Sequence, residues 1–117
     1  MGTTSIDYSV PTGYTLACEL SAVPLRGKKY LRIGDRDVLI VACEGALYAV
    51  EDRCPQTGGS IAHGAVLDGV ITTPTVGARY DLRTGQYVGG GQSPLQSHWL
   101  TVFPLRVIDE RVYIHIP

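Results

Sequence analysis

The chain carries two loop-like runs, Cys54-Pro55-Gln56-Thr57-Gly58-Gly59 and Thr73-Pro74-Thr75-Val76-Gly77-Ala78, and these runs decide how it is expected to fold. Both combine proline, glycine and small polar residues, which favour turns over regular structure. The second run continues into Arg79-Tyr80-Asp81-Leu82, an alternating strand pattern, and then into a tight turn at Arg83-Thr84-Gly85. The sequence therefore predicts two loops beside a set of short strands.

The two runs resemble the loops of Rieske-type [2Fe–2S] domains. In that family the first loop reads Cys-x-His and the second reads Cys-x-x-His-Gly, and two thiolates hold one iron while two imidazoles hold the other. Cys54 and Gln56 stand at the first pair of positions, and Thr73 and Val76 stand at the second pair. The resemblance implies an all-β fold, which is a Rieske-like β-sandwich with a small cluster-binding-type β-subdomain that carries both loops.

The side chains at these four positions determine the expected cofactor. A [2Fe–2S] core needs four strong donors, and Cys54 supplies one thiolate. Thr73 offers a neutral hydroxyl, Val76 has no lone pair, and Gln56 offers an amide oxygen that is a poor partner for iron. We therefore expect no [2Fe–2S] cluster and no other metal in this vestigial site. Thr73 is expected to bond nearby backbone, and Gln56 is expected to bridge the two loops.

Length and composition exclude several classes of protein. The chain has 117 residues, 44% of them hydrophobic, which is enough for one domain with its own core. Its net charge of −1 argues against nucleic acid as a partner. A membrane span is not expected because no apolar run approaches the roughly 20 residues required. The first residues do not read as a signal peptide, and three cysteines do not suggest a disulfide framework, so a reducing cytoplasm is expected.

Short β-branched and aromatic runs predict strands through most of the chain and no helix. The expected strands cover residues 14–20, 29–33, 38–43, 46–51, 70–73, 79–82, 86–88, 100–108 and 111–116. The first four are expected to form a meander of hairpins, and the last two a closing hairpin. Residues 1–13 are expected to be a tail, 14–117 a single domain, and 54–88 its vestigial loop subdomain. Residues 89–93 are expected to be a mobile surface loop.

Candidate functional residues gather around the two loops. A pocket or a partner surface is expected to use residues from this set: Arg53, Gln56, His63, Thr73, Val76, Arg79 and Tyr80. Arg79 and Asp81 share one strand face and are expected to form an ion pair. Trp99 is expected to pack against the sheet. No arrangement of catalytic residues is recognisable in the sequence, and whether the chain is an enzyme is left open.

Three functions are compatible with this reading. The first is a cluster-free, non-redox accessory protein or small subunit of an oxidoreductase, which binds a large subunit through its loops. The second is a small-molecule pocket between the loops that performs cofactor-independent isomerase or cyclase chemistry in a biosynthetic pathway. The third is an ordinary electron-transfer ferredoxin, which the missing donors disfavour. An exposed surface at the loops would favour the first function, and a polar cavity would favour the second.

Overall fold

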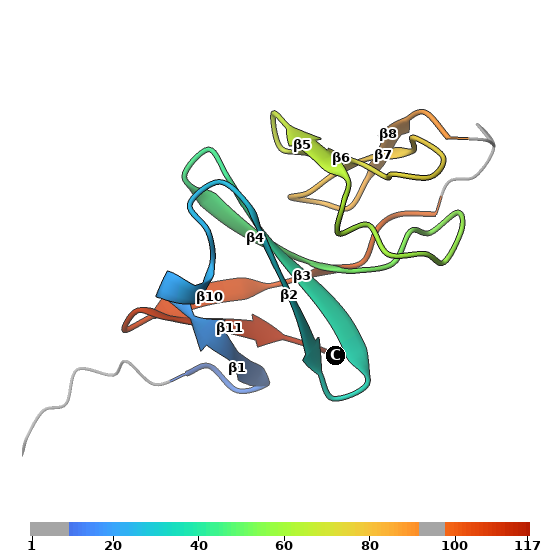
Figure 1. Cartoon of the computed structure of the whole chain (residues 1–117). Coiled ribbons are helices and arrows are strands. Elements are labelled where there is room, and N and C mark those ends of the chain that lie inside the picture. Colours follow the sequence, from blue (N-terminus) through green and yellow to red (C-terminus); the bar gives the residue numbers. More distant parts are fainter. Residues whose placement is uncertain (1–9, 92–97) are drawn as a thin grey trace, which may run out of the picture.

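The structure is a computed structural model that describes residues 10–91 and 98–117. Within them it contains antiparallel strands and a single-turn 3₁₀ helix, Leu20–Ala22, so the all-β prediction is confirmed (Figure 1). None of the described residues belongs to a helix long and apolar enough to cross a membrane. The strands are β1 (Tyr14–Glu19), β2 (Lys28–Ile33), β3 (Arg36–Cys43), β4 (Ala46–Glu51), β5 (Ala65–Leu67), β6 (Val70–Thr72), β7 (Arg79–Asp81), β8 (Tyr87–Gly89), β9 (Val102–Phe103), β10 (Leu105–Ile108) and β11 (Arg111–His115).

These strands form three antiparallel sheets. Their orders are β1-β11-β10, β2-β3-β4-β9 and β5-β6-β7-β8. Figure 1 shows the β2-β3-β4-β9 sheet in the middle, with the sheet of β1 on one side and the sheet of β5 to β8 at the opposite end. We call the β5-β6-β7-β8 sheet the loop sheet, because the two glycine-containing runs lie before and within it. The central sheet therefore packs against both of the others.

Strand β3 is the centre of the molecule, and its sequence shows why. Its residues from Val38 to Val41 are an unbroken apolar run, and all four side chains are almost fully buried. Because successive side chains of a strand point to opposite faces, Val38 and Ile40 join one core, and Leu39 and Val41 join the other. A strand that is buried on both faces needs no polar alternation.

The two cores differ in where they lie. One contains Phe103, Val112 and Ile114, and it fills the space between the central sheet and the sheet of β1. The other contains Ile61, Ile71, Tyr80 and Leu82, together with Cys54, and it joins the central sheet to the loop sheet. The cysteine of the first loop is thus a member of a core and not a surface residue.

The structure departs from the predicted strands in three places. Strand β1 pairs with β11 instead of β2, which removes it from the expected meander. Strand β5 was not predicted, since its three residues are too few to show a pattern. The expected long strand over residues 100–108 is divided, because Pro104 separates β9, which pairs with β4, from β10, which pairs with β11.

Candidate functional site

Backbone hydrogen bonds close each of the two loops on itself. In the first loop, the N–H of Cys54 donates to the carbonyl oxygen of Gly59 at 2.7 Å, and the N–H of Gly58 donates to the carbonyl of Cys54 at 2.7 Å. In the second, the N–H of Thr73 donates to the carbonyl of Ala78 at 2.8 Å. The Thr73 hydroxyl oxygen also accepts a hydrogen bond from the N–H of Ala78 at 3.0 Å, as expected. Each loop is therefore closed by its own backbone hydrogen bonds.

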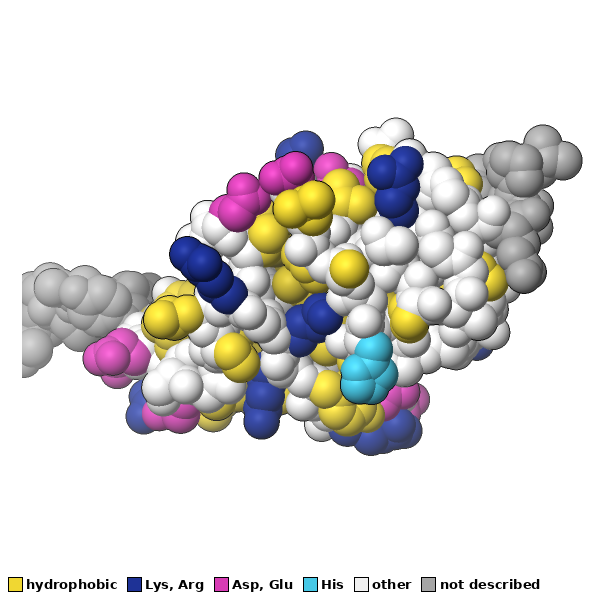
Figure 2. Space-filling view, turned by 45° about the horizontal axis from the view of Figure 1, so that its top comes forward, with side chains coloured by type: hydrophobic (Ala, Val, Ile, Leu, Met, Phe, Trp, Pro, Cys, Tyr) yellow, Lys and Arg dark blue, Asp and Glu magenta, His cyan; other side chains and the backbone are white. Residues whose placement is uncertain are grey.

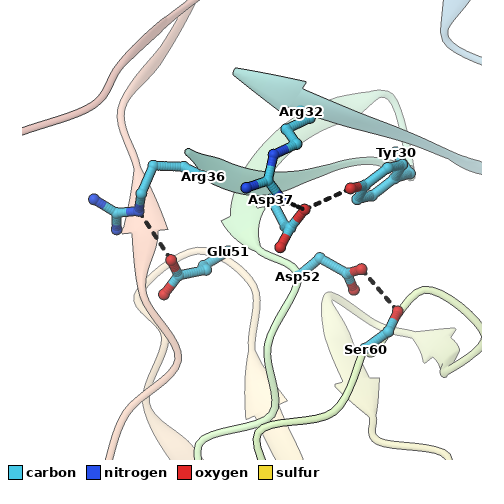
Figure 3. A network of polar contacts seen from close by, with 7 residues as sticks. All are labelled: Tyr30, Arg32, Arg36, Asp37, Glu51, Asp52 and Ser60. Atoms are coloured by element: carbon cyan, nitrogen blue, oxygen red, sulfur yellow. Dashed lines mark hydrogen bonds and ion pairs between the residues drawn. The ribbon is translucent and has the colours of Figure 1, made fainter. Parts of the chain in front are cut away.

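A buried carboxylate fastens the first loop to the central sheet. Asp52 follows β4 directly and is only 9% exposed. Its carboxylate accepts hydrogen bonds from the Ser60 hydroxyl at 2.7 Å, drawn in Figure 3, and from the backbone N–H of Ile61 at 2.7 Å. Its own N–H donates to the carbonyl of Asp37 in β3 at 2.9 Å. The sequence reasoning overlooked Asp52, although its position between a strand and a predicted loop marks it as a possible cap.

Cys54, at the start of the first loop, is buried in the core that joins the central sheet to the loop sheet. It is 3% exposed, and Thr73 is 2% exposed. Burial by itself raises the pKa of the Cys54 thiol, but the Thr57 hydroxyl, the backbone amides of Gln56 and Thr57, and the Thr73 hydroxyl outweigh it. The net pKa lies below the ordinary value, because these hydrogen-bond donors favour the thiolate. Residues of both loops thus contribute to lowering the pKa of this one thiol.

Two buried polar atoms of the loop region have no partner within hydrogen-bond distance among the described residues. They are Nε2 of Gln56 and the hydroxyl oxygen of Tyr80, and both are buried. Burial raises the pKa of Tyr80 and Cys54 raises it further, whereas the nearby Gln56 side chain lowers it as a weak hydrogen-bond partner would, although the two groups do not meet normal hydrogen-bond geometry. The Gln56 amide also lies against Gly91, where a Cβ atom would stand 2.6 Å from Oε1. The expected bridge from Gln56 to the second loop is therefore not formed by Nε2.

The glycines at the end of β8 are packed tightly instead of forming a loose loop. Gly89 belongs to β8, and Gly90, at φ +75°, lies so close to the carbonyl oxygen of Gly77 that a Cβ would stand 2.2 Å from it. Glycine is needed at position 90 because the φ angle is positive and because a side chain would collide with the Gly77 carbonyl oxygen. The last part of the expected mobile loop, Gln92 and Ser93, lies outside the described residues.

A shallow hollow of about 300 Å³ lies next to the first loop. Segments far apart in the sequence form it, and its lining residues are Glu51, Arg53, Pro55, His98, Trp99 and Thr101. Trp99 is 55% exposed, so the prediction that it packs against the sheet is wrong. The residues after it are fixed, because Leu100 donates to the Gly85 carbonyl and Glu51 donates to the Thr101 carbonyl. The backbone that directly follows this exposed indole is therefore fixed.

The remaining predicted residues are spread over the surface. His63 and Arg79 are exposed, and neither lines this hollow. The expected ion pair between Arg79 and Asp81 is absent from the described ion pairs. Asp81 instead accepts hydrogen bonds from the N–H groups of Arg83 and Thr84 and shapes the turn after β7. On the face in Figure 2, acidic side chains gather along the upper edge, whereas acidic and basic side chains lie beside one another along the lower edge.

The residues at the four loop positions do not fit a [2Fe–2S] cluster. Cys54 is the one strong donor among them, because Gln56, Thr73 and Val76 supply neither thiolate nor imidazole. Val76 packs against the core that contains Tyr80. Among the residues that the structure describes, no three or more His, Cys, Asp or Glu side chains are grouped to hold a metal ion.

Comparison with solved structures gives the fold a clear set of relatives. The chain is similar to the ferredoxin of carbazole 1,9a-dioxygenase from Nocardioides aromaticivorans IC177, with a TM-score of 0.77 and 14% identity over 91% of this chain and 100% of that one. It is also similar to a chain in the complex of reduced oxygenase and oxidized ferredoxin in carbazole 1,9a-dioxygenase, with a TM-score of 0.74 and 23% identity over 90% and 94% of the two chains.

A terminal oxygenase contains the same fold within a longer chain. The terminal oxygenase of carbazole 1,9a-dioxygenase from Novosphingobium sp. KA1 matches with a TM-score of 0.81 and 17% identity, over 93% of this chain but 31% of the oxygenase chain. At these identities the likeness concerns the fold, which agrees with the predicted Rieske-like sandwich. The fold thus occurs both as a separate protein and as part of a larger oxygenase chain.

A family model described as a Rieske-like [2Fe-2S] domain matches residues 13–115. The prediction that the chain takes no [2Fe–2S] cofactor is wrong by this comparison, since the family and the ferredoxin structures both point to such a cluster. That prediction rested on the donor chemistry of four side chains alone, whereas the match extends over nearly the whole chain. The chain belongs to the family of Rieske-like [2Fe-2S] domains.

Proposed function

We propose that this chain is an accessory component or small subunit of an oxidoreductase and binds a larger subunit beside its first loop. The observation that carries the proposal is the exposed Trp99 next to Arg53 and the hollow between them. Tryptophan and arginine are the residue types most enriched among those that dominate binding energy at protein interfaces. An exposed indole beside a depression is a suitable anchor for a partner.

The kind of partner is suggested by the similar structures. One of them is a complex of an oxygenase with a ferredoxin, and another is a terminal oxygenase that contains this fold. Arg53 is exposed and lies next to Glu51, whose carboxylate is already bound by Arg36 at 3.0 Å. The positive charge of Arg53 therefore remains available for an acidic group on the partner. The three free cysteines suit a reducing cytoplasm.

The alternative of an open pocket for isomerase or cyclase chemistry gains less support. Hollows of about 550 and 300 Å³ exist in the described part of the chain, but Gln56, Thr73, Val76 and Tyr80 line neither of them. The side chains between the loops are closely packed, with Tyr80 fully buried. A substrate would have to open the loops before it reached them. We therefore prefer binding at the outer surface.

Photo-crosslinking in the native host tests the accessory role. A photoreactive phenylalanine derivative replaces Trp99 in one variant and Val107, an exposed residue of β10, in the control. We expect position 99 to capture a discrete larger protein that mass spectrometry identifies as an oxidoreductase subunit, and position 107 to capture none. Equal capture at both positions, or no oxidoreductase subunit at position 99, would contradict the proposal.

A further inference from the structure

A second hollow, of about 550 Å³, lies between one end of the central sheet and strand β5. We call it the β5 groove, and it is lined by residues 26–28, 41–44 and 64–68. Figure 1 shows β5 as the strand of the loop sheet that lies nearest to the turn between β3 and β4. The β5 groove shares no lining residue with the hollow beside Trp99, so it is a separate site.

Strand β5 turns its edge toward this groove. The side chains of successive strand residues point to opposite faces, so a strand that lined a hollow with one face would contribute every second residue. Residues 64–68 all line the β5 groove, and β5 is the outermost strand of the loop sheet. The backbone of β5 therefore borders the groove along its free edge.

The hydrogen-bond pattern identifies which backbone groups of β5 point outward. The N–H of Thr73 donates to the carbonyl of Ala78, so Thr73 and, two residues earlier, Ile71 direct their backbone groups away from β5. Val66 is the partner of Ile71 in the β5–β6 register. In an antiparallel ladder, two partners that do not bond each other direct their N–H and C=O groups away from each other. The N–H and C=O of Val66 therefore point out of the sheet edge, where no described strand pairs with them.

The charged side chains around the groove have a definite arrangement. Lys28 is half-buried beside the buried Val41, its partner in the β2–β3 register, and Arg26 lies on the same segment. Glu44 and Asp68 are exposed in the two hairpin turns. None of these four charged residues takes part in the ion pairs of the described residues. The groove thus has an unpaired basic inner part and an unpaired acidic rim.

We propose that the β5 groove binds an extended peptide segment of a partner protein, which adds to β5 as a further strand. The segment carries an acidic residue between two β-branched apolar residues, with a basic residue at either end. Its backbone bonds the outward N–H and C=O of Val66, its acidic side chain meets Lys28, and its basic side chains meet the acidic rim. Its apolar side chains pack on Leu67, which is 73% exposed without a partner.

Two cysteines allow occupancy of the groove to be measured. Cys43 lies in its lining and reports on binding, whereas Cys18 packs against the other core and is the internal control. The full-length protein is alkylated with iodoacetamide in the presence of the blocked peptide acetyl-Lys-Val-Glu-Val-Lys-amide, and mass spectrometry follows each cysteine. This peptide has the same sequence in both directions, so it tests either strand orientation. We expect a saturating concentration to slow the alkylation of Cys43 several-fold and to leave Cys18 unchanged.

Two matched peptides separate charge recognition from backbone pairing. The peptide acetyl-Glu-Val-Lys-Val-Glu-amide reverses the charges, and a version of the first peptide that is N-methylated at every residue has no N–H donors. We expect each to require at least about a tenfold higher concentration for half-protection of Cys43. Neither comparison changes the protein, so a folding defect cannot produce the difference.

Substitutions at the edge test the role of Val66. Val66→Pro removes the outward N–H and keeps the pairing with β6, since an edge strand tolerates proline, whereas Val66→Thr retains the N–H. We expect Val66→Pro to raise the half-protecting concentration about five- to tenfold and Val66→Thr to leave it unchanged. Circular dichroism should show the same β content in both variants.

The proposal is overturned if the first peptide does not protect Cys43, or if the charge-reversed or N-methylated peptide protects it equally well. It is overturned as well if Val66→Pro and Val66→Thr, with equal β content, bind the first peptide alike. A purified chain that sediments as a dimer and is dissociated by Val66→Pro would also overturn it, because a second copy would then occupy the edge of β5.

Discussion

At the scale of single residues, Asp52 fastens the first loop of the candidate site to the central sheet. It is the carboxylate that joins β4 to the first loop through Ser60 and Ile61, and Figure 3 shows it beside the Tyr30–Asp37–Arg32 and Arg36–Glu51 contacts. Those neighbouring contacts are on or near the surface, whereas Asp52 accepts hydrogen bonds in the interior. Removing a buried acceptor leaves its donors unsatisfied, which costs more than the hydrogen bond itself contributed.

The first prediction follows from this position. Asp52→Ala should lower the free energy of unfolding by about 2 to 3 kcal/mol, because the buried N–H of Ile61 loses a charged acceptor. Urea unfolding followed by tryptophan fluorescence measures the change. Asp35→Ala, at an exposed turn position, is the control and should change stability by less than about 0.5 kcal/mol. Equal losses of unfolding free energy in the two variants would show that Asp52 does not stabilise the first loop.

Tyr80 gives a prediction of the opposite sign. Its buried hydroxyl has no partner in the described chain, so Tyr80→Phe should raise the free energy of unfolding of the reduced protein by about 1 kcal/mol. Removing the hydroxyl leaves the packing of the ring unchanged. Urea unfolding in the presence of a thiol reductant measures this difference. A loss of stability of similar size would mean that the hydroxyl is hydrogen-bonded in the reduced state.

Asp37 gives a pH-dependent prediction. The hydrogen bond from the Tyr30 hydroxyl, helped by Arg32, lowers the pKa of Asp37 below its ordinary value of 3.8. Since the folded pKa is the lower one, the stabilisation is present above pH 3.8 and is lost as the pH falls through the folded pKa. We expect Tyr30→Phe to lose less stability on acidification below about pH 4 than the unmodified chain does. Parallel pH dependences of unfolding would contradict this assignment.

At the scale of elements, the sequence predicts strands better than their partners. The apolar run in β3 and the alternation in β7 were sufficient to place these strands. A strand that is buried on both faces is apolar throughout, and a strand that is buried on one face alternates between apolar and polar residues. The pairing of β1 with β11 depends on contacts between the two ends of the chain, which no local pattern contains. Strand β5 is too short to produce a pattern at all.

The candidate site shows the same division. The spacing of Cys54, Gln56, Thr73 and Val76 correctly placed both loops, because loop chemistry is local. The exposure of Trp99 and the packing of Gly90 against Gly77 were not predictable, since both arise where segments distant in sequence meet. The cofactor prediction failed because four side chains were weighed without the family match over the rest of the chain.

The turn at Gly85 provides the prediction at this scale. Gly85 has φ +84°, and a Cβ there would lie 2.0 Å from the carbonyl oxygen of Leu100, the residue that follows Trp99. Gly85→Ala should destabilise the protein by more than about 2 kcal/mol, because it adds this clash to the strain of a positive φ. Gly34→Ala is the matched control, with φ +62° and no atom near the added methyl group, and should cost about 1 kcal/mol. Thermal unfolding of both variants tests the difference, and similar losses would exclude close packing as the cause.

At the scale of the whole molecule, the three sheets bring two distant segments together at one end. Residues 51–55 leave β4 toward the first loop, and residues 98–101 lead into β9, which pairs with β4. The hollow beside Trp99 therefore rests on the hydrogen bonds of the central sheet and does not depend on the side chains between the loops. A surface supported in this way can bind a partner whatever occupies the interior of the loops.

The binding surface can consequently be separated from the fold by mutation. Trp99→Ala and Arg53→Ala should each leave the free energy of unfolding within about 0.5 kcal/mol of the unmodified value, because both side chains are exposed. Trp99→Ala should weaken binding to the subunit captured by crosslinking by at least about 2 kcal/mol, near thirtyfold in the dissociation constant. Arg53→Ala should also reduce the dependence of binding on salt, as one charge pair is lost. Calorimetric titration of the purified pair measures both effects, with Val107→Ala on β10 as the control. If Trp99→Ala binds as tightly as Val107→Ala, the partner contacts a different surface, since the fold that presents the indole would be intact.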